Sequence, residues 1–254
     1  MDLHQVKVFQ ELTNNAWRAK EYFFLNGWIL RLSDGNFTRT NSVFPIRYYG
    51  SNLKQDIQRV EDIYQKKKLD VAFQIPANCD PPNLDRMLRS LGYEEKYRIL
   101  VMAKKISNSS QSKLSDQDSF SVNISDFSNL WFDKFVLFGN ESPTQKAHIK
   151  EVLKLNIIPK RFFFFLSIDQ EIAGVTLAVR EEKYLGLSLV AVDPELRRKG
   201  IGRFLMRYII NWCIKNQLET IYLQVYHENT PALLMYEKLG FKHIFNYHYR
   251  IKGS

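Results

Sequence analysis

A short basic segment, Arg197-Arg198-Lys199-Gly200-Ile201-Gly202-Arg203, combines the residue types that bind anions in proteins. Glycines let a ligand approach the backbone closely, and the first N–H groups of a helix have no acceptor within that helix. The helix dipole favours negative charge at the same end. The segment is neither the dinucleotide fingerprint nor the phosphate loop, and taken alone it could equally be a structural turn. Its location between a strand pattern and a helix pattern favours a diphosphate-sized anion site.

The elements around this segment follow from hydrophobic periodicity and from breakers. Two Val, Leu and Ile-rich runs separated by charged residues predict a strand hairpin, and Asp193 with Pro194 ends its second strand. Apolar residues from Ile201 to Cys213 then fall on one helix face. Thr230 and Pro231 supply an N-cap and a first-turn proline for another helix. The second half therefore predicts strand, strand, helix, strand, helix and strand over residues 171–179, 184–192, 201–213, 220–225, 230–239 and 241–251.

Composition bounds the remaining possibilities. The chain has 254 residues with 45% hydrophobic residues, which is enough apolar material for a packed core. Cys79 and Cys213 cannot form a disulfide framework and lack the close partners that metal ligation requires, so we expect no metal and a reducing, cytoplasmic location. Neither an 18-residue apolar run nor a signal-peptide pattern occurs, so we expect no membrane span. The net charge of +9 suggests an anionic partner without identifying it.

The chain also carries signs of a duplication. Residues 107–119 are almost entirely polar and predict a linker between halves 1–106 and 120–254. The first half repeats the order of the second at nearly the same spacing, although chance similarity of two α/β segments is an alternative. A hairpin at Ser33-Asp34-Gly35 is expected to open the first copy. The matching segments are 42–45 with 191–194, 70–75 with 220–225, and 91–93 with 239–241, and Gln74 corresponds to Gln224.

The segment from Val190 to Phe241 resembles the acyl-coenzyme A binding region of the GNAT superfamily of N-acetyltransferases. The matching residues are Val190, Ala191, Val192, Asp193, Pro194, Arg197, Arg198, Lys199, Gly200, Ile201, Gly202, Asn229, Ala232, Tyr236, Lys238, Leu239, Gly240 and Phe241. The resemblance covers residues 120–254, and the first half looks like the degenerate copy of tandem members. It implies an α/β fold of the α+β mixed-sheet type, with two tandem GNAT-like domains, each a mixed, mostly antiparallel sheet flanked by helices.

The resemblance also implies site roles, with acetyl-CoA as the acyl donor. Backbone groups of Val190, Ala191 and Val192 would contact the pantetheine arm, and one N–H there would polarise the thioester carbonyl. The pyrophosphate would be held by Arg197, Arg198, Lys199, Gly200, Ile201, Gly202 and Arg203. Asn229 would bind the cofactor arm, and the hydroxyl of Tyr236 would protonate the departing thiolate.

The general base is left open. Many relatives carry a Glu on the strand before the Asn, but this chain has Gln224 there, and an amide cannot take a proton at neutral pH. Glu228, Glu141, His227 or a chain of water molecules could serve. Each of these side chains could also be a plain surface residue.

The first half keeps the apolar pattern but loses the chemistry. Only Gly50 and Ser51 precede its helix, and Leu88 stands where Tyr236 stands, so we expect no coenzyme site there. A structural or substrate-shaping role follows, because adjacent domains commonly form a cleft. The candidates for that cleft are Trp17, Trp28, Arg31, Arg39 and Asn41, although packing or surface roles are as consistent with their types.

The leading hypothesis is an N-acyltransferase in which an amine, on a small molecule or a peptide, attacks the thioester directly within a ternary complex. The alternative is a non-catalytic acetyl-CoA binding or regulatory module, which the absence of a matched base at Gln224 favours and the presence of Tyr236 opposes. A third hypothesis, RNA binding, rests only on the net charge of +9, and we do not expect a nucleic-acid partner. No feature of the sequence encodes the oligomeric state.

Overall fold

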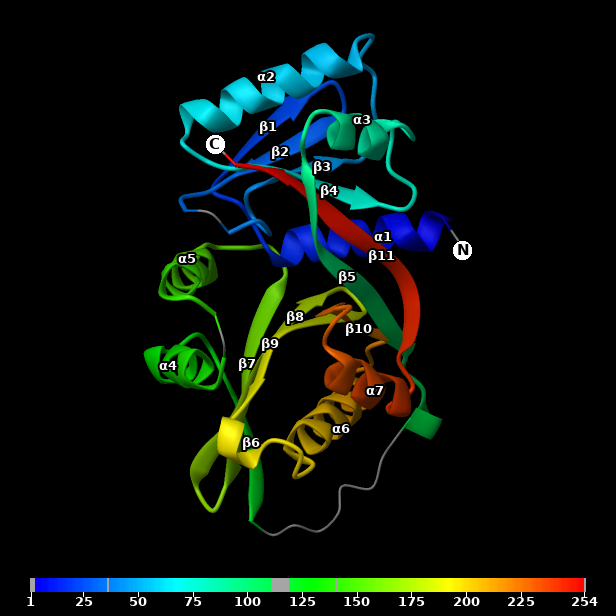
Figure 1. Ribbon diagram of the computed structural model, residues 1–254. Coiled ribbons are helices and arrows are strands. Elements are labelled where there is room, and N and C mark those ends of the chain that lie inside the picture. The colour runs from blue at the N-terminus through cyan, green and yellow to red at the C-terminus, as the bar shows by residue number, and fades with distance from the viewer. Residues whose placement is uncertain (1–2, 36, 111–118, 140, 254) are drawn as a thin grey trace.

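A computed structural model describes the chain apart from residues 1–2, 36, 111–118, 140 and 254 (Figure 1). Seven α-helices and eleven strands occur in the described residues. In chain order the elements are α1 (Leu3–Ala16), β1 (Glu21–Leu25), β2 (Trp28–Leu32), β3 (Ser42–Pro45), α2 (Leu53–Lys66), β4 (Val71–Pro76), α3 (Leu84–Ser90), β5 (Glu94–Lys105), η1 (Asn108–Ser110), β6 (Phe120–Ser125), α4 (Asn129–Phe138), α5 (Pro143–Lys154), β7 (Lys160–Ile168), β8 (Glu171–Glu181), β9 (Tyr184–Val192), η2 (Pro194–Leu196), α6 (Ile201–Lys215), β10 (Thr220–Tyr226), α7 (Thr230–Lys238) and β11 (Lys242–Lys252).

The strands form one mixed sheet in the order β1-β2-β3-β4-β11-β5-β10-β9-β8-β7-β6. Only the β3–β4 and β9–β10 pairs are parallel among the described strands. Strand β5 of the first half lies between β10 and β11, and β11 of the second half lies between β4 and β5. The expected mixed sheet with flanking helices is confirmed. The sheets of the two halves are joined, however, because each half completes its sheet with a strand from the other.

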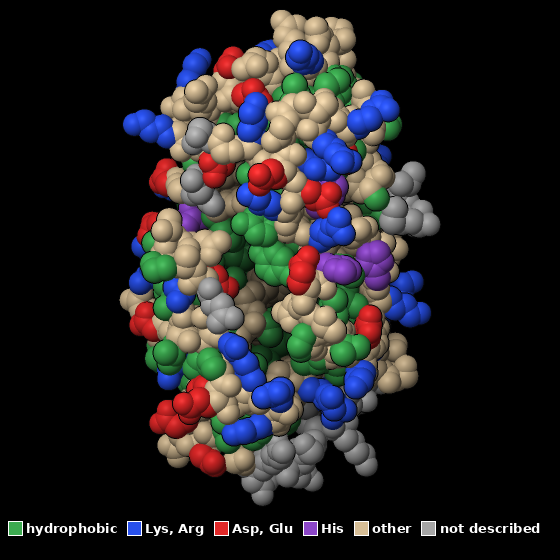
Figure 2. Space-filling model, viewed as in Figure 1, with side chains coloured by type: hydrophobic (Ala, Val, Ile, Leu, Met, Phe, Trp, Pro, Cys, Tyr) green, Lys and Arg blue, Asp and Glu red, His purple; other side chains and the backbone are tan. Residues whose placement is uncertain are grey.

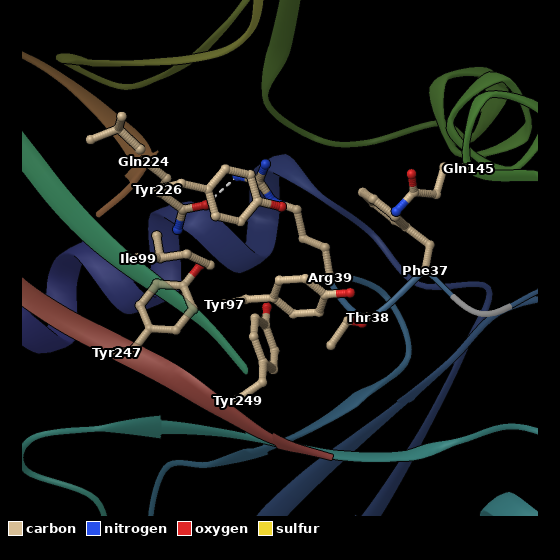
Figure 3. A pocket seen from close by; sticks show the side chains of 11 residues that line it. Phe37, Thr38, Arg39, Tyr97, Ile99, Gln145, Gln224, Tyr226, Tyr247 and Tyr249 are labelled. Carbon is tan, nitrogen blue, oxygen red and sulfur yellow. Dashed lines mark hydrogen bonds between the residues drawn. The ribbon is translucent and has the colours of Figure 1, made fainter. Parts of the chain in front are cut away.

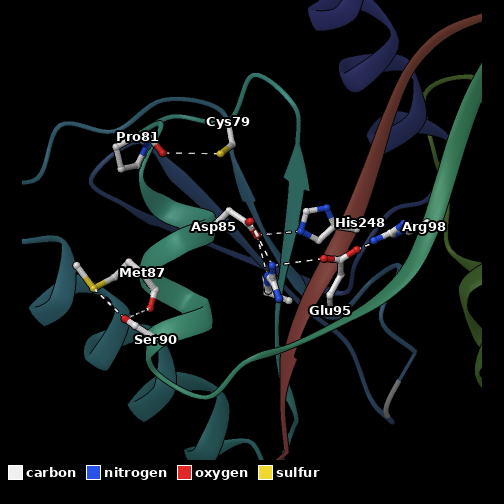
Figure 4. Close-up of polar contacts among 9 residues, drawn as sticks. Cys79, Pro81, Asp85, Met87, Ser90, Glu95, Arg98 and His248 are labelled. Carbon is white, nitrogen blue, oxygen red and sulfur yellow. Dashed lines mark hydrogen bonds and ion pairs between the residues drawn. The ribbon is translucent and has the colours of Figure 1, made fainter.

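An ion-pair cluster fixes this exchange at the C-terminal strand (Figure 4). The guanidinium of Arg250 on β11 donates to both carboxylate oxygens of Asp85 on α3, at 2.7 and 3.2 Å. His248, on the same strand, lies 2.9 Å from Asp85 Oδ1, and Glu95 on β5 is 3.4 Å from Arg250. Two residues of the last strand are thereby tied to a helix of the first half.

Helices cover both faces of the sheet (Figure 1). Leu205 of α6 and Tyr236 of α7 share an apolar cluster with β7 to β10, whereas Trp131 of α4 and Ile149 of α5 belong to a cluster on the opposite face. Helix α1 lies over the joint between the halves, where the ring of Phe9 is 5.4 Å from that of Tyr222 on β10. The first half has its own cluster under α2 and α3.

The local expectations for the second half are confirmed by β8, β9, α6, β10, α7 and β11. The expected opening hairpin at residues 33–35 is wrong, because the first turn lies at Asn26-Gly27 between β1 and β2. Both turn residues have positive φ, 48° and 89°, which is what a two-residue hairpin turn of the primed type requires. Residues 33–35 lie in the longer connection between β2 and β3. The predicted linker 107–119 falls largely outside the described residues.

Candidate active site

Strands β9 and β10 separate part-way along their length. Their parallel pairing ends at Leu187 with Leu223, and the next part of β9 bulges, with Leu189 at a φ of 51°. Beyond the bulge, Ala191 and Val192 pair only with β8. The backbone edge of residues 190–192 that faces β10 is therefore left outside the sheet ladder. An unpaired edge of this kind can pair with an extended ligand as an added strand would.

The turn before α6 presents backbone N–H groups near this gap. Gly200 caps the helix with a φ of 87°, and a Cβ at this position would meet no atom within 4 Å. Glycine is therefore required by the left-handed backbone conformation and not by a lack of space. Phe204 N–H bonds to Gly200 C=O at 2.9 Å, and the N–H groups of Ile201, Gly202 and Arg203 precede this first helical bond. Anions are stabilised at such a helix start.

The basic side chains of the turn differ in role. Arg198, Lys199 and Arg203 are exposed and can reach a phosphate bound at the turn. Arg197 instead donates to the backbone oxygens of Val192, at 3.1 Å, and of Phe138, at 2.6 Å. Its guanidinium therefore braces the turn against α4, a structural contact that the sequence pattern did not reveal.

Helix α7 packs Tyr236 against α6 and β10. Tyr236 is 5% exposed and shares an apolar cluster with Ile201 of α6 and Leu223 of β10. Burial raises the pKa of its hydroxyl to about 12, so the group stays protonated at neutral pH. Asn229 accepts a hydrogen bond from the N–H of Ala232 at 3.3 Å and thus caps α7. Its side chain is otherwise exposed.

A pocket opens on the α1 face of the sheet, where β10 passes beyond its pairing with β9 (Figure 3). Its empty volume is about 580 Å³ when the open solvent at its mouth is counted. Arg39 Nη2 donates to Gln224 Oε1 inside it, and the guanidinium lies over the Trp17 ring, 4.4 Å from the centroid. The space-filling view shows this side of the molecule hollowed between the halves, with hydrophobic side chains in the hollow (Figure 2). The pocket is lined by Phe37, Thr38, Arg39, Tyr97, Ile99, Gln145, Gln224, Val225, Tyr226, Tyr247 and Tyr249.

The sequence patterns did not predict that several of these residues would line a pocket. Tyr97, Tyr226, Tyr247 and Tyr249 come from three different strands, β5, β10 and β11. The available signal was the alternation of Tyr247 and Tyr249, which places both on one sheet face. Of the five cleft candidates, Arg39 lines the pocket and Trp17 supports it.

Of the other three cleft candidates, Trp28 and Arg31 are structural, whereas Asn41 also lines a second hollow, together with Thr38 and Tyr97. Trp28 is fully buried in the first-half core. Arg31 is held by Ser42 and by Gln74, at 3.0 Å, and Asn41 accepts from the Ser33 N–H at 2.6 Å. Arg31 bonds to Gln74 within the first half, whereas Arg39, also from the first half, bonds to the corresponding residue of the second half, Gln224.

The candidate general bases differ in how exposed their side chains are to solvent. His227 and Glu228 are exposed, whereas Glu141 Oε2 is buried and has no hydrogen-bond partner within the described part of the chain. Glu141 lies close enough to Tyr226 that, after burial and the tyrosine neighbours, its charge helps to raise the pKa of that phenol. The carboxylate is therefore within electrostatic range of Tyr226 at the end of β10, with its Oε2 packed beside Gly139.

The corresponding position in the first half is closed. Gly50 is crowded by the Tyr48 hydroxyl and the Asp56 carboxylate, which hydrogen-bond to each other at 2.9 Å. Asn52 caps α2 through the Gln55 N–H. An acidic group in the first turn repels a phosphate, and Leu88 is buried in the core. These contacts are consistent with the expected loss of a coenzyme site.

Metal ligands do not gather in the part of the chain that the structure describes, which includes no group of three or more His, Cys, Asp or Glu side chains placed to hold a metal ion. No helix of the described chain has the length and apolar character that crossing a bilayer requires.

The comparisons with known proteins agree with this geometry. A family model described as "Probable histone acetyltransferase Rv0428c C-terminal" matches residues 5–250. The chain is 28% identical to the "Uncharacterized N-acetyltransferase YobR" of Bacillus subtilis, over 98% of this chain and 100% of the relative. A 52-residue stretch, 20% of this chain and 35% of the relative, is 40% identical to the ribosomal protein bS18-alanine N-acetyltransferase of Escherichia coli.

Solved structures show the same fold. A GCN5-related N-acetyltransferase from Kribbella flavida superposes with a TM-score of 0.75 at 10% identity, over 100% of this chain and 97% of that one. A tandem GNAT protein from the clavulanic acid biosynthesis pathway gives a TM-score of 0.63 at 12% identity, over 89% of this chain and 78% of that one. The chain belongs to the Rv0428c-like acetyltransferase family and is a GNAT-type N-acetyltransferase.

Proposed function

We propose that the second half transfers an acetyl group from acetyl-CoA to a primary amine, by direct attack within a ternary complex. The observation that supports this proposal is the gap between β9 and β10, which has the start of α6 on one side, while Tyr236 packs in the cluster that contains Leu223 of β10. An extended arm ending in a diphosphate fits such a gap. Acetyl-CoA, when bound, would supply the activated thioester.

In this proposal, different residues of the chain bind the diphosphate, align the extended arm and protonate the leaving sulfur. The N–H groups from Arg198 to Arg203 hold the diphosphate, and the edge at 190–192 aligns the arm and donates one N–H to the thioester oxygen. As the N–C bond forms and the C–S bond breaks, the hydroxyl of Tyr236 stabilises the sulfur by donating its proton. Its raised pKa, about 12, keeps that proton in place until then.

The amine must also lose a proton, and we propose Glu141 as the acceptor. Its buried oxygen lacks a partner among the described residues, whereas Gln224 is occupied by Arg39 and cannot act as a base. Glu141 and Tyr236 would then serve the two ends of the reaction, the nitrogen and the sulfur.

The test is calorimetric titration with acetyl-CoA, comparing the wild type with Gly200→Val and Gly92→Val. Both glycines have positive φ, 87° and 85°, and a Cβ added at either position would meet no atom within 4 Å. A branched residue in this conformation costs about 1–2 kcal/mol at either site, so the two variants should lose similar stability. Only Gly200→Val should weaken acetyl-CoA binding, by about tenfold or more.

Equal affinity in the two variants would place the cofactor elsewhere, and no binding by the wild type would remove the proposal. Where binding is found, amines are then screened by measuring the release of free thiol. Product identification by mass spectrometry establishes that the added group is acetyl and that it is attached to nitrogen.

A further inference from the structure

Arg39 is a charged group without an acidic partner. It is the one charged residue among the described residues lining the pocket beside Gln224. Its hydrogen-bond acceptor is the neutral amide of Gln224, and its flat face rests on Trp17. No carboxylate of the described chain forms an ion pair with it, although eleven such pairs occur elsewhere in the same residues.

Arg39 is only partly buried, but its guanidinium still loses part of its contact with water, and no opposite charge replaces that water. Burial lowers the pKa of Arg39, yet a guanidinium keeps its charge at physiological pH. A bound carboxylate or phosphate would supply the missing charge through short, charge-assisted hydrogen bonds. The cost in the free protein is therefore offset by a ligand of opposite sign.

The other polar groups of the pocket are suited to the same ligand. Tyr226, Tyr247 and Tyr249 lie within electrostatic range of Arg39, and the view into the pocket shows their side chains gathered around it (Figure 3). Burial raises the pKa of Tyr226 and of Tyr247, so both hydroxyls remain protonated donors. The tyrosine rings also form apolar walls, with Tyr247 and Tyr249 edge to face at 5.6 Å.

The pocket adjoins the place where chemistry is proposed. Gln224 directly follows Leu223, the last residue of β10 that pairs with β9. An anion held by Arg39 would thus lie close to the base of the gap, and an amine a few bonds away from it could reach the thioester.

We propose that the amine acceptor is a small molecule that also carries an anionic oxygen group, a carboxylate or a phosphate, which Arg39 binds. A compact apolar or aromatic body of the acceptor rests between the tyrosines. This inference relies on the proposed function for the position of the amine. The inference argues against a cationic peptide as the acceptor, because a pocket that binds such a peptide would be expected to have acidic residues in its lining.

The kinetic test uses amines that differ only in the acid group. Phenylalanine is compared with phenethylamine, and phosphoethanolamine with ethanolamine, by thiol release from acetyl-CoA. We expect kcat/KM to be about tenfold or more higher for at least one anionic member, and Arg39→Gln to abolish that preference. Arg39→Lys should retain part of it, because the charge remains. Arg47→Gln is the matched control, since Arg47 also stacks on a ring, that of Tyr49 at 5.5 Å, but lies outside the pocket.

A binding test distinguishes this inference from the proposed function. Phenylacetate, phenyl phosphate and neutral phenylacetamide are titrated calorimetrically into the wild type and the Arg39 variants, with thermal melts to confirm folding. Tighter binding of an anion, lost in Arg39→Gln, supports the anion site even if acetyl-CoA does not bind and the proposed function fails. The inference is overturned if neither anion binds more tightly than phenylacetamide, or if Arg39→Gln weakens the neutral probe equally.

Discussion

Replacing Asp85 by Asn tests the contact that fixes the exchanged strand β11 to α3. Asp85 receives hydrogen bonds from Arg250 at 2.7 and 3.2 Å, and Arg250 is only 8% exposed. Hydrogen bonds to charged groups contribute about 1.5–3 kcal/mol, and the 37% exposure of Asp85 places the expected loss toward the lower part of that range. Glu95, at 3.4 Å, compensates Arg250 only in part. We therefore expect a loss of about 2 kcal/mol, which is about 4–8 °C in Tm for a chain of this size.

The pH dependence of this loss has a definite sign. The hydrogen bond from Arg250 and the proximity of His248 hold the pKa of Asp85 below its usual range, against the opposing effect of burial. A carboxyl group whose pKa is depressed by folding stabilises the folded state at pH values above its pKa in the unfolded chain, which is about 4. This stabilisation is lost as the pH falls through the pKa of the folded state. The difference in the free energy of unfolding between the wild type and Asp85→Asn should therefore be largest at neutral pH and decrease as the solution becomes acidic.

Urea and thermal unfolding followed by circular dichroism measure the effect. Glu94→Gln is the matched control, because Glu94 is 70% exposed in its ion pair with Lys96 and its loss should change stability by no more than about 0.5 kcal/mol. A stability change for Asp85→Asn no larger than that of the control would refute the reasoning. So would a difference that persists undiminished below the pKa of Asp85.

Three further predictions concern the site. Tyr236→Phe should lower kcat about 100-fold or more, measured by thiol release, while its affinity for acetyl-CoA, measured by calorimetry, stays within about twofold of the wild type. Tyr222→Phe, which removes another buried hydroxyl, is the control and should leave kcat unchanged. An unchanged kcat in Tyr236→Phe would exclude the acid role. Arg198→Ala should weaken acetyl-CoA binding severalfold at low salt and less at about 1 M salt, where exposed charges are screened, and a salt-independent loss would contradict a phosphate contact. Glu141→Gln should lower kcat while acetyl-CoA affinity stays unchanged, and exposed Glu228→Gln should not lower kcat; the opposite result would transfer the base role to Glu228.

Local periodicity and local chemistry were enough to predict part of this protein. The elements from β8 to β11 were predicted because each combines a clear hydrophobic period with breakers at its ends. The turn before α6 was predicted because glycine at Gly200 answers a local requirement, a φ of 87°. The hairpin at Asn26-Gly27 is equally local, and the prediction failed because the later Asp34-Gly35 pair was given that role.

The joining of the two halves and the residues that line the pocket depend instead on tertiary packing. Strands β5 and β11 have the pattern of strands, but period-two alternation specifies which faces are apolar and not which neighbour pairs with which edge. The same holds for Arg39 and Gln224, which are 185 residues apart and meet because the exchanged strands and α1 bring the halves together. Contacts at that separation depend on the packing of the whole sheet, and no local spacing in the chain encodes them.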